Sequence, residues 1–172
     1  MQTTRLILAP MATLTNPAFR TLIDEFGGCD LFFTEMISAE AFRGGTPFED
    51  AYRDPRPDPA RLVYQLVGRS AEPIVEAARR LAAEPVAGID INMGCSAPKI
   101  AKRGAGVTWM SDAAAAAQLI SRVREAVPPG QTVSAKLRLG TGGEPDALVR
   151  FARGLEAAGA DFLTLHPRLV KQ

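Results

Sequence analysis

Short apolar segments alternate along the chain with helix-like segments, and this alternation restricts the fold more than any other feature of the sequence. Several of the apolar segments are almost continuously apolar, as strands covered on both faces are. The pattern predicts βαβ units and a parallel sheet. The predicted strands are Leu6–Ala9, Asp30–Thr34, Leu62–Val67, Gly88–Asn92, Thr132–Leu137 and Asp161–Leu165.

The segments between the predicted strands carry helix signals. Asn16 followed by Pro17 is typical of a helix N-cap with proline in the first turn. Ser111 or Asp112 can cap an alanine-rich helix. The stretch Thr46–Pro59 contains four prolines and is expected to form a loop or a lid on the barrel face rather than a linker. The predicted helices are Asn16–Phe26, Pro73–Ala83, Asp112–Val127 and Pro145–Ala158.

This order of elements suits either a doubly wound sheet or most of a (β/α)8 barrel, and the alternation alone does not decide between them. A complete barrel typically takes about 250 residues. The chain has 172 residues and would therefore stop just after the sixth strand of a barrel.

Composition narrows the classes of function. Hydrophobic residues make up 47% of the chain, and the formal net charge is +1, so bulk charge gives no reason to expect a polyanion partner. A nucleic-acid role would need a local basic patch. We see no apolar run long enough to span a bilayer and no signal peptide, and expect a cytoplasmic protein. Cys29 and Cys95 do not form a CxxC pair, so neither a disulfide scaffold nor a metal site is expected.

Polar and reactive side chains gather where the predicted strands end, which is the active-site end of a barrel. Lys136 and Arg138 are two residues apart in one strand and therefore point to the same face. Packing alone does not explain so many polar strand ends. The residues concerned are Pro10 and Met11, Glu35, Gln65, Asn92 and Cys95, Lys136 and Arg138, and His166 and Arg168.

Six segments resemble motifs of the tRNA-dihydrouridine synthase family, in the family's order. They read LAPMA (8–12) with NPAFR (16–20), TEMISA (34–39), QLVG (65–68), IDINMGC (89–95), KLRLG (136–140) and TLHPR (164–168). The resemblance covers nearly the whole chain. Two positions depart from the usual pattern, since Ser96 follows the cysteine in place of proline and Pro167 follows the histidine in place of glycine.

The resemblance implies an α/β fold, a (β/α)8 TIM barrel that is incomplete here, with about six of eight strands and residues 1–172 as a partial catalytic domain. It implies FMN as cofactor, NADPH or NADH as reductant, and reduction of uridine to 5,6-dihydrouridine in tRNA. Cys95 is then the general acid that protonates C5, since a free thiol is mostly protonated at neutral pH. A small buried cysteine would be the structural alternative.

By the same resemblance, the residues that contact the flavin are Pro10, Met11, Gln65, Lys136 and His166. The substrate-binding candidates are Asn92, Arg138, Lys99 and Arg168, with tRNA as the partner and neither DNA nor a membrane. Each has a structural alternative. A buried amide can pair with backbone, a methionine can fill the core, and a lone histidine can be a hydrogen-bonded structural residue.

The loop from Lys99 to Gly106 is the only concentrated basic cluster near the expected site. Basic residues beside a site for an extruded base suit phosphate contacts, and a solvated charged loop is the alternative. No GxGxxG fingerprint follows a strand.

Strands seven and eight, whose loops commonly hold phosphate in such barrels, and the family's C-terminal helical domain are not found in these residues. We expect a fragment or a truncated descendant that pairs with another chain, with self-association through unpaired barrel edges. Two alternatives remain open. One is an FMN barrel acting on a free pyrimidine, similar to a dihydroorotate dehydrogenase, and the other is a non-catalytic RNA-binding or partner-binding remnant.

Overall fold

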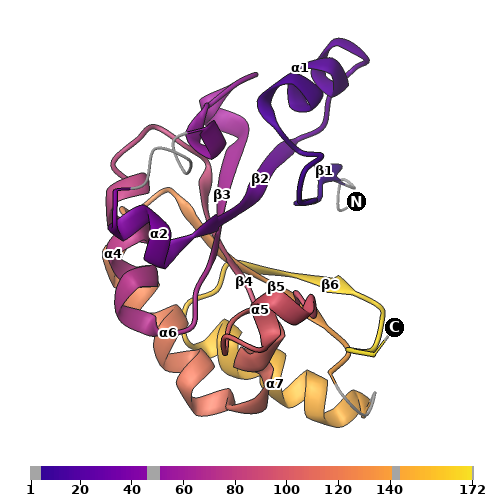
Figure 1. Cartoon of the computed structure of the whole chain (residues 1–172), viewed down its shortest axis with the longest axis vertical. Coiled ribbons are helices and arrows are strands. Elements are labelled where there is room, and N and C mark those ends of the chain that lie inside the picture. The colour runs from indigo at the N-terminus through magenta and orange to yellow at the C-terminus, as the bar shows by residue number, and fades with distance from the viewer. Residues whose placement is uncertain (1–4, 46–50, 141–143, 172) are drawn as a thin grey trace.

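The computed structural model describes residues 5–45, 51–140 and 144–171. They form a single parallel sheet in which six strands follow one another in sequence order, from β1 to β6. The sheet curls, and β1 and β6 stand on either side of its open side, near the two chain ends (Figure 1). This confirms the incomplete (β/α)8 barrel and excludes a doubly wound sheet. The strands are β1 (Ile7–Leu8), β2 (Leu31–Ser38), β3 (Leu62–Val67), β4 (Gly88–Asn92), β5 (Thr132–Arg138) and β6 (Phe162–His166).

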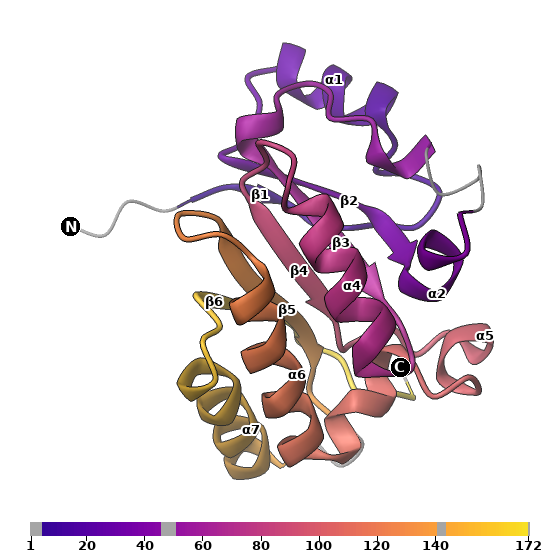
Figure 2. The same cartoon turned by 90° about the vertical axis from the view of Figure 1, so that its left-hand side faces the viewer.

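Helices cover the outer side of the curled sheet. Helices α4, α6 and α7 lie side by side across it, with α2 beyond α4 (Figures 1 and 2). The helices are α1 (Pro17–Glu25), α2 (Ala39–Arg43), α4 (Ala71–Leu81), α5 (Pro98–Ala101), α6 (Ala113–Ala126) and α7 (Pro145–Ala157). Three 3-10 turns complete the described elements, namely η1 (Ala51–Arg53), η2 (Pro59–Arg61) and η3 (Gly106–Ser111).

Local sequence explains the helix boundaries. The Asn16 side chain accepts a hydrogen bond from the Phe19 amide at 3.0 Å, as the predicted N-cap requires. Asp112, rather than Ser111, caps α6 by accepting from the Ala115 amide at 2.9 Å. The buried residues of α6 are spaced three and four apart and face the sheet, as in an amphipathic helix. They are Ala116, Leu119, Ile120 and Val123.

The two faces of the sheet differ in chemistry because side chains alternate along each strand. Leu62, Tyr64 and Leu66 of β3 belong to the apolar core. Gln65 lies between them on the opposite, inner face, next to Asp90 of β4 in the strand register. The helices therefore cover an apolar outer face, while the inner face is free to carry polar groups.

Residues 51–61, which lead into β3, form a loop with two 3-10 turns, as predicted, but they are not a lid over the strand ends. Arg53 forms an ion pair of 2.7 Å with Glu84, which precedes β4. The Arg20 guanidinium donates to the carbonyls of Asp54 and Arg56 at 2.5 and 2.9 Å. These contacts hold the segment at the amino ends of the strands. The prediction for residues 46–50 lies outside the described residues.

Candidate functional site

The inner face of β3, β4 and β5 carries a row of polar side chains at the carboxyl ends of the strands. Strand register pairs Gln65 with Asp90, Asp90 with Ser134, and Asn92 with Lys136. Parallel strands end at a common edge, so the alternation of side chains brings all five groups onto one surface. The sheet geometry thus assembles residues from three separate segments of the sequence.

A continuous chain of hydrogen bonds runs through this row to Cys95. The Asp90 carboxylate accepts from Ser134 Oγ at 2.6 Å and from Gln65 Nε2 at 2.7 Å. Gln65 Oε1 accepts from Asn92 Nδ2 at 2.9 Å. Asn92 Oδ1 in turn accepts from the Cys95 amide at 2.9 Å. The backbone position of Cys95 therefore depends on a buried carboxylate in the middle of β4.

The chain of hydrogen bonds from Asp90 to Cys95 also fixes the orientation of the Gln65 and Asn92 side-chain amides. An amide nitrogen has two hydrogens, and Gln65 and Asn92 each use one of them within the chain. Asn92 Oδ1 has no acceptor capacity left, because it also accepts from the Gly94 amide at 3.2 Å. Gln65 therefore keeps one N–H and one lone pair of Oε1, and Asn92 keeps one N–H. In this structure Gln65 is fully buried and Asn92 nearly so.

Burial shifts the pKa values of Asp90 and Lys136. Asp90 is inaccessible to solvent, and its desolvation raises the pKa of its carboxyl to about 6, against the opposing effects of Ser134, Gln65 and Lys136. Desolvation lowers the pKa of the Lys136 ammonium, which Asp90 raises and Arg138 lowers. In the described part of the chain, no hydrogen-bond acceptor engages the Lys136 ammonium. A partly buried cation with unused donors suits an anionic or electron-rich ligand.

The turn that carries Cys95 is held from both sides. Arg138 Nε donates to the Gly94 carbonyl at 2.8 Å, and Met93 N donates to the Lys136 carbonyl at 2.9 Å. On the other side, the Val107 amide donates to the Cys95 carbonyl at 3.0 Å. The backbone of the turn is thus fixed, and Cys95 as a residue is partly exposed.

Gly106 allows η3 to approach Cys95. Its φ is +60°, a left-handed conformation that favours glycine, and a Cβ there would lie 2.6 Å from the Cys95 carbonyl oxygen. Any other residue would displace either the Cys95 turn or the start of η3.

The remaining sequence candidates lie around this centre. His166 pairs in register with Arg138 on β5, and desolvation together with the charges of Lys136 and Arg138 lowers the pKa of the imidazole. Pro10 and Met11 follow β1, at the opposite end of the sheet. The loop after Met11 is tied to β2 because the Thr13 amide donates to the Glu35 carboxylate.

Two substrate-binding candidates sit at the rim rather than in the row. Lys99 on α5 and Arg168 after β6 are both exposed. Arg138 has a structural contribution that the sequence did not indicate, since it binds the Leu169 carbonyl at 2.9 Å as well as that of Gly94. It fixes the relative position of the β4 and β6 ends.

Sequence reasoning missed Asp90 and Ser134. Asp90 is the only acidic residue of β4, in a strand that is otherwise apolar up to Asn92. Burying a carboxylate in a parallel strand costs free energy unless it has hydrogen-bond partners. An acidic residue in an apolar strand was therefore the sequence signal for a polar network at this position. Ser134 gave no such signal, because a small hydroxyl is common in a buried strand.

These donors fit the pyrimidine edge of a flavin. That edge presents carbonyl oxygens and ring nitrogens, and reduction makes it electron-rich. Gln65 offers an N–H and Lys136 an ammonium on the same inner surface. Pro10 and Met11 follow β1, and His166 ends β6, so these candidates lie at the two edge strands of the sheet.

A family model described as "Dihydrouridine synthase (Dus)" matches residues 7–172. A "Probable tRNA-dihydrouridine synthase" of Aquifex aeolicus is 37% identical over 169 residues, which is 96% of this chain and 52% of that protein. The Synechocystis "Probable tRNA-dihydrouridine synthase 1" is 33% identical, covering 95% of this chain and 45% of that protein.

A third relative, the "tRNA-dihydrouridine(16) synthase" of Salmonella typhimurium, is 31% identical over 176 residues, which is 98% of this chain and 55% of that protein. The chain spans about half the length of these curated relatives.

Proposed function

Because the chain belongs to the dihydrouridine synthase family, we propose that it carries the reducing site of an FMN-dependent tRNA-dihydrouridine synthase. The reaction is the reduction of uridine in tRNA to 5,6-dihydrouridine, with NADPH or NADH as the source of electrons. The observation that supports this most is the chain of hydrogen bonds from Asp90 to the backbone amide of Cys95, a partly exposed residue in the turn after β4, with the partly buried Lys136 ammonium on the neighbouring strand.

The residues proposed to hold the flavin are Gln65, Lys136 and His166, with Met11 and Pro10 against the ring. FMN held by these residues would supply the hydride that reduces C6 of the uracil. Gln65 would donate its unused N–H to the ring, and its orientation is set by Asp90. Lys136 would place positive charge beside the electron-rich edge. Burial lowers the pKa of this ammonium, so an anionic partner would stabilise its charged form.

Cys95 is the proposed proton donor. Hydride addition at C6 leaves an electron pair at C5, and transfer of the thiol proton to C5 completes the reduction and leaves a thiolate. The thiolate then regains a proton from solvent, for which the partial exposure of Cys95 is sufficient. The role of Asn92 is to hold the Cys95 amide and to offer one N–H to a uracil carbonyl.

tRNA is the proposed substrate, and the basic groups near Cys95 are suited to its backbone. Lys99, Lys102 and Arg103 follow Cys95 on and after α5, and all three are exposed. Such side chains neutralise phosphates without specifying sequence. A base that reacts at Cys95 must leave its stack, so the enzyme needs contacts to the surrounding backbone.

A substrate comparison tests the proposal. The full-length protein, with saturating FMN and NADPH, is incubated with unmodified tRNA, with free uracil and with orotate, and the products are quantified by mass spectrometry. The proposal expects dihydrouridine in tRNA and no turnover of the free pyrimidines. Turnover of a free pyrimidine in preference to tRNA would contradict it, and so would a flavin-free protein that binds tRNA without reducing it.

A further inference from the structure

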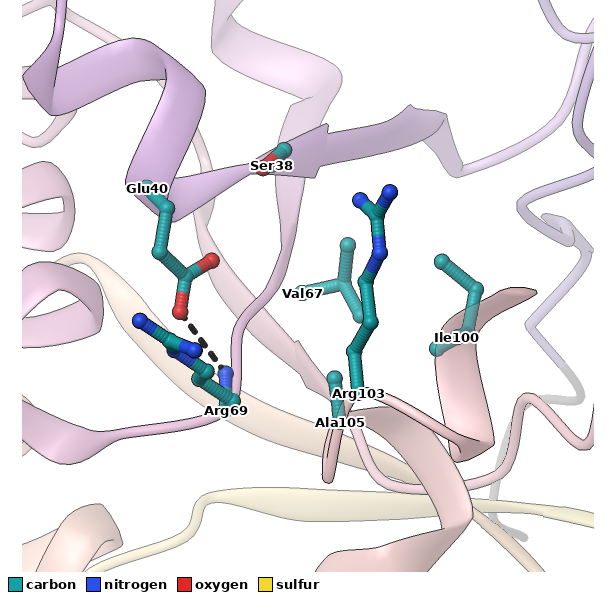
Figure 3. Close-up of a pocket in the computed structure, with 7 residues that line it drawn as sticks. All are labelled: Ser38, Glu40, Val67, Arg69, Ile100, Arg103 and Ala105. Atoms are coloured by element: carbon teal, nitrogen blue, oxygen red, sulfur yellow. Dashed lines mark hydrogen bonds between the residues drawn. The ribbon is translucent and has the colours of Figure 1, made fainter. Parts of the chain in front are cut away.

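A cavity of about 360 Å³ opens beside the Cys95 turn, at the carboxyl ends of β2 and β3. Val67, Ile100 and Ala105 supply apolar surface, while Arg69 and Arg103 supply charge (Figure 3). The volume lies within the range of small-molecule sites, roughly 300–1,000 Å³. None of these lining residues takes part in the hydrogen-bonded row from Asp90 to Cys95, so the cavity is a separate feature of the same barrel edge.

The cavity shares a wall with the Cys95 turn. The Ala105 amide donates to the Ile100 carbonyl at 3.3 Å, and the next residue, Gly106, is packed against the Cys95 carbonyl. Trp109 of η3 links the same loop to the end of β3, because its Nε1 donates to the carbonyl of Gly68 at 2.8 Å, and Gly68 is the residue before Arg69. The loop that positions Cys95 is therefore also the loop that forms the cavity.

The two arginines are available to a ligand. The Arg103 side chain rises across the cavity between Val67 and Ile100 (Figure 3). Among the residues that the structure describes, no hydrogen-bond or ion-pair partner engages the guanidinium of Arg69 or Arg103. A guanidinium can bind phosphate through two parallel hydrogen bonds and can stack on a nucleobase.

Glu40 indicates a nucleotide rather than a bare anion. One of its carboxylate oxygens accepts from the Arg69 amide at 2.9 Å (Figure 3). The carboxylate lines the cavity and retains acceptor capacity, which would repel an isolated phosphate but can accept from a ribose hydroxyl or a base amino group. Apolar surface, two guanidinium groups and one carboxylate together match the base, phosphate and sugar of a nucleotide.

We propose that this cavity holds a nucleotide next to the target uridine in tRNA, with Arg103 on its phosphate and Val67 and Ile100 against its base. The proposal rests on the proposed function. When a base is extruded toward Cys95, its neighbours in the strand lose stacking, and a site on the same loop can hold one of them. The cavity thereby contributes to binding of the RNA and not to the chemical step.

The test uses the full-length protein with saturating FMN and the variant Arg103→Gln, with Arg69→Gln as a second variant. Arg79→Gln on α4 is the matched control, because Arg79 is an exposed arginine on a helix that covers the outer side of the sheet. Initial rates give kcat and KM for tRNA and for NADPH. Binding of unmodified tRNA is measured separately by fluorescence anisotropy.

Arg103→Gln should raise the KM for tRNA roughly tenfold, as expected for losing a hydrogen bond to a charged group. The KM for NADPH and kcat should stay within about twofold, and the salt dependence of tRNA binding should lose about one unit of slope. A tRNA KM equal to that of Arg79→Gln would overturn the proposal, and a raised NADPH KM would assign the cavity to the reductant instead. If the parent protein binds tRNA but does not reduce it, the proposed function fails. The affinity of Arg103→Gln for tRNA, measured by anisotropy, then still shows whether the cavity binds RNA.

Discussion

Asp90 determines the direction of every hydrogen bond between β4 and the Cys95 turn. When the Asp90 carboxylate is ionised, it accepts hydrogen bonds and has no proton to donate. Gln65 must therefore turn its amide nitrogen toward Asp90 and its oxygen toward Asn92. Asn92 must then turn its oxygen toward the Cys95 amide. A single buried acid therefore sets the polarity of the row.

We predict that Asp90→Asn lowers kcat on tRNA by roughly tenfold or more, with little change in the KM for tRNA, because misplacement of a reacting group is costly. An asparagine can present its NH2 group to Gln65, which reverses the amide order and leaves the Cys95 amide facing a donor. Ser134→Ala is the control, since it removes the other hydrogen bond of Asp90 and leaves the row to Cys95 intact. Steady-state kinetics would contradict the account if both variants lost the same activity.

The same residue gives a pH dependence of stability. The pKa of Asp90 is about 6 in the folded protein, above the value of about 3.9 for an unfolded aspartate. The folded state therefore holds this proton more tightly. Asp90 therefore contributes on the order of 3 kcal/mol to the free energy of unfolding below about pH 4. This contribution is lost as the pH rises through about 6.

Urea denaturation of the parent protein and of Asp90→Asn, at pH 4.5 and pH 7.5, isolates this contribution. The parent should lose stability relative to the variant as pH rises between these values. A difference between the two proteins that stays constant with pH would show that Asp90 is not the titrating group.

The identity of the site residues could be predicted from the sequence better than the hydrogen bonds among them. Gln65, Asn92, Cys95 and Lys136 were all identified from their places along the predicted strands and at their ends. The structure brings Gln65, Asn92 and Lys136 onto one surface, with the Cys95 amide hydrogen-bonded to Asn92. The order of donors and acceptors among them could not be predicted. It depends on Asp90, whose burial follows only from the strand register.

At the level of elements, the two central strands were predicted to the residue, because β3 and β4 are covered on both faces and end at glycine or polar turns. Strand β2 runs to Ser38, four residues beyond its predicted end at Thr34. The register between β2 and β3 shifts between Phe33 and Met36, so an irregularity lets the strand continue past its polar residues. Long-range pairing of this kind leaves no local signal in sequence.

The short elements α5 and η3 were not predicted either. Both belong to the loop that follows Cys95, whose sequence is rich in lysine, arginine and glycine. Their conformation depends on tertiary contacts, such as that of Val107 with the Cys95 carbonyl, rather than on helix propensity.

Gly106→Ala tests whether this loop positions Cys95. Both Gly104 and Gly106 have positive φ, at +78° and +60°, so alanine at either position costs roughly 1 kcal/mol of backbone strain. Only at Gly106 would the new Cβ meet Cys95, since at Gly104 the nearest atom is 3.9 Å away.

We expect Gly104→Ala to lower stability slightly and to leave kcat nearly unchanged. Gly106→Ala should lower stability further and reduce kcat by roughly tenfold or more, because the Cys95 carbonyl must move. The measurements are the urea midpoint and tRNA reduction. Equal kcat values for the two variants would refute a positioning role for the loop.

For the whole molecule, the order of strands decided between two folds that the sequence left open. Sequential pairing from β1 to β6 gives a curled sheet whose first and last strands are both edges. These edges expose large apolar side chains, including Ile7 and Leu165. None of the described helices is long and apolar enough to cross a membrane.

We predict that the 172-residue chain on its own binds FMN weakly and self-associates. The residues proposed to contact the ring are part of this chain, but phosphate groups in such barrels are commonly held by loops after strands seven and eight. Exposed strand edges pair with other chains. Flavin fluorescence during titration, together with sedimentation velocity, checks both parts. Tight one-to-one FMN binding by a monodisperse monomer would contradict this account of the cofactor site.

The proposed function assigns the reduction of uridine in tRNA to this barrel and the donation of the proton to Cys95. The most direct measurement is a single-turnover experiment on the full-length protein, in which flavin reduced beforehand is mixed with unmodified tRNA and its reoxidation is followed by absorbance. Cys95→Ala should bind FMN as the parent does and should reoxidise it with tRNA roughly 10²- to 10⁴-fold more slowly, the usual cost of losing a general acid. An unchanged rate of reoxidation with full dihydrouridine formation in Cys95→Ala would contradict the claim.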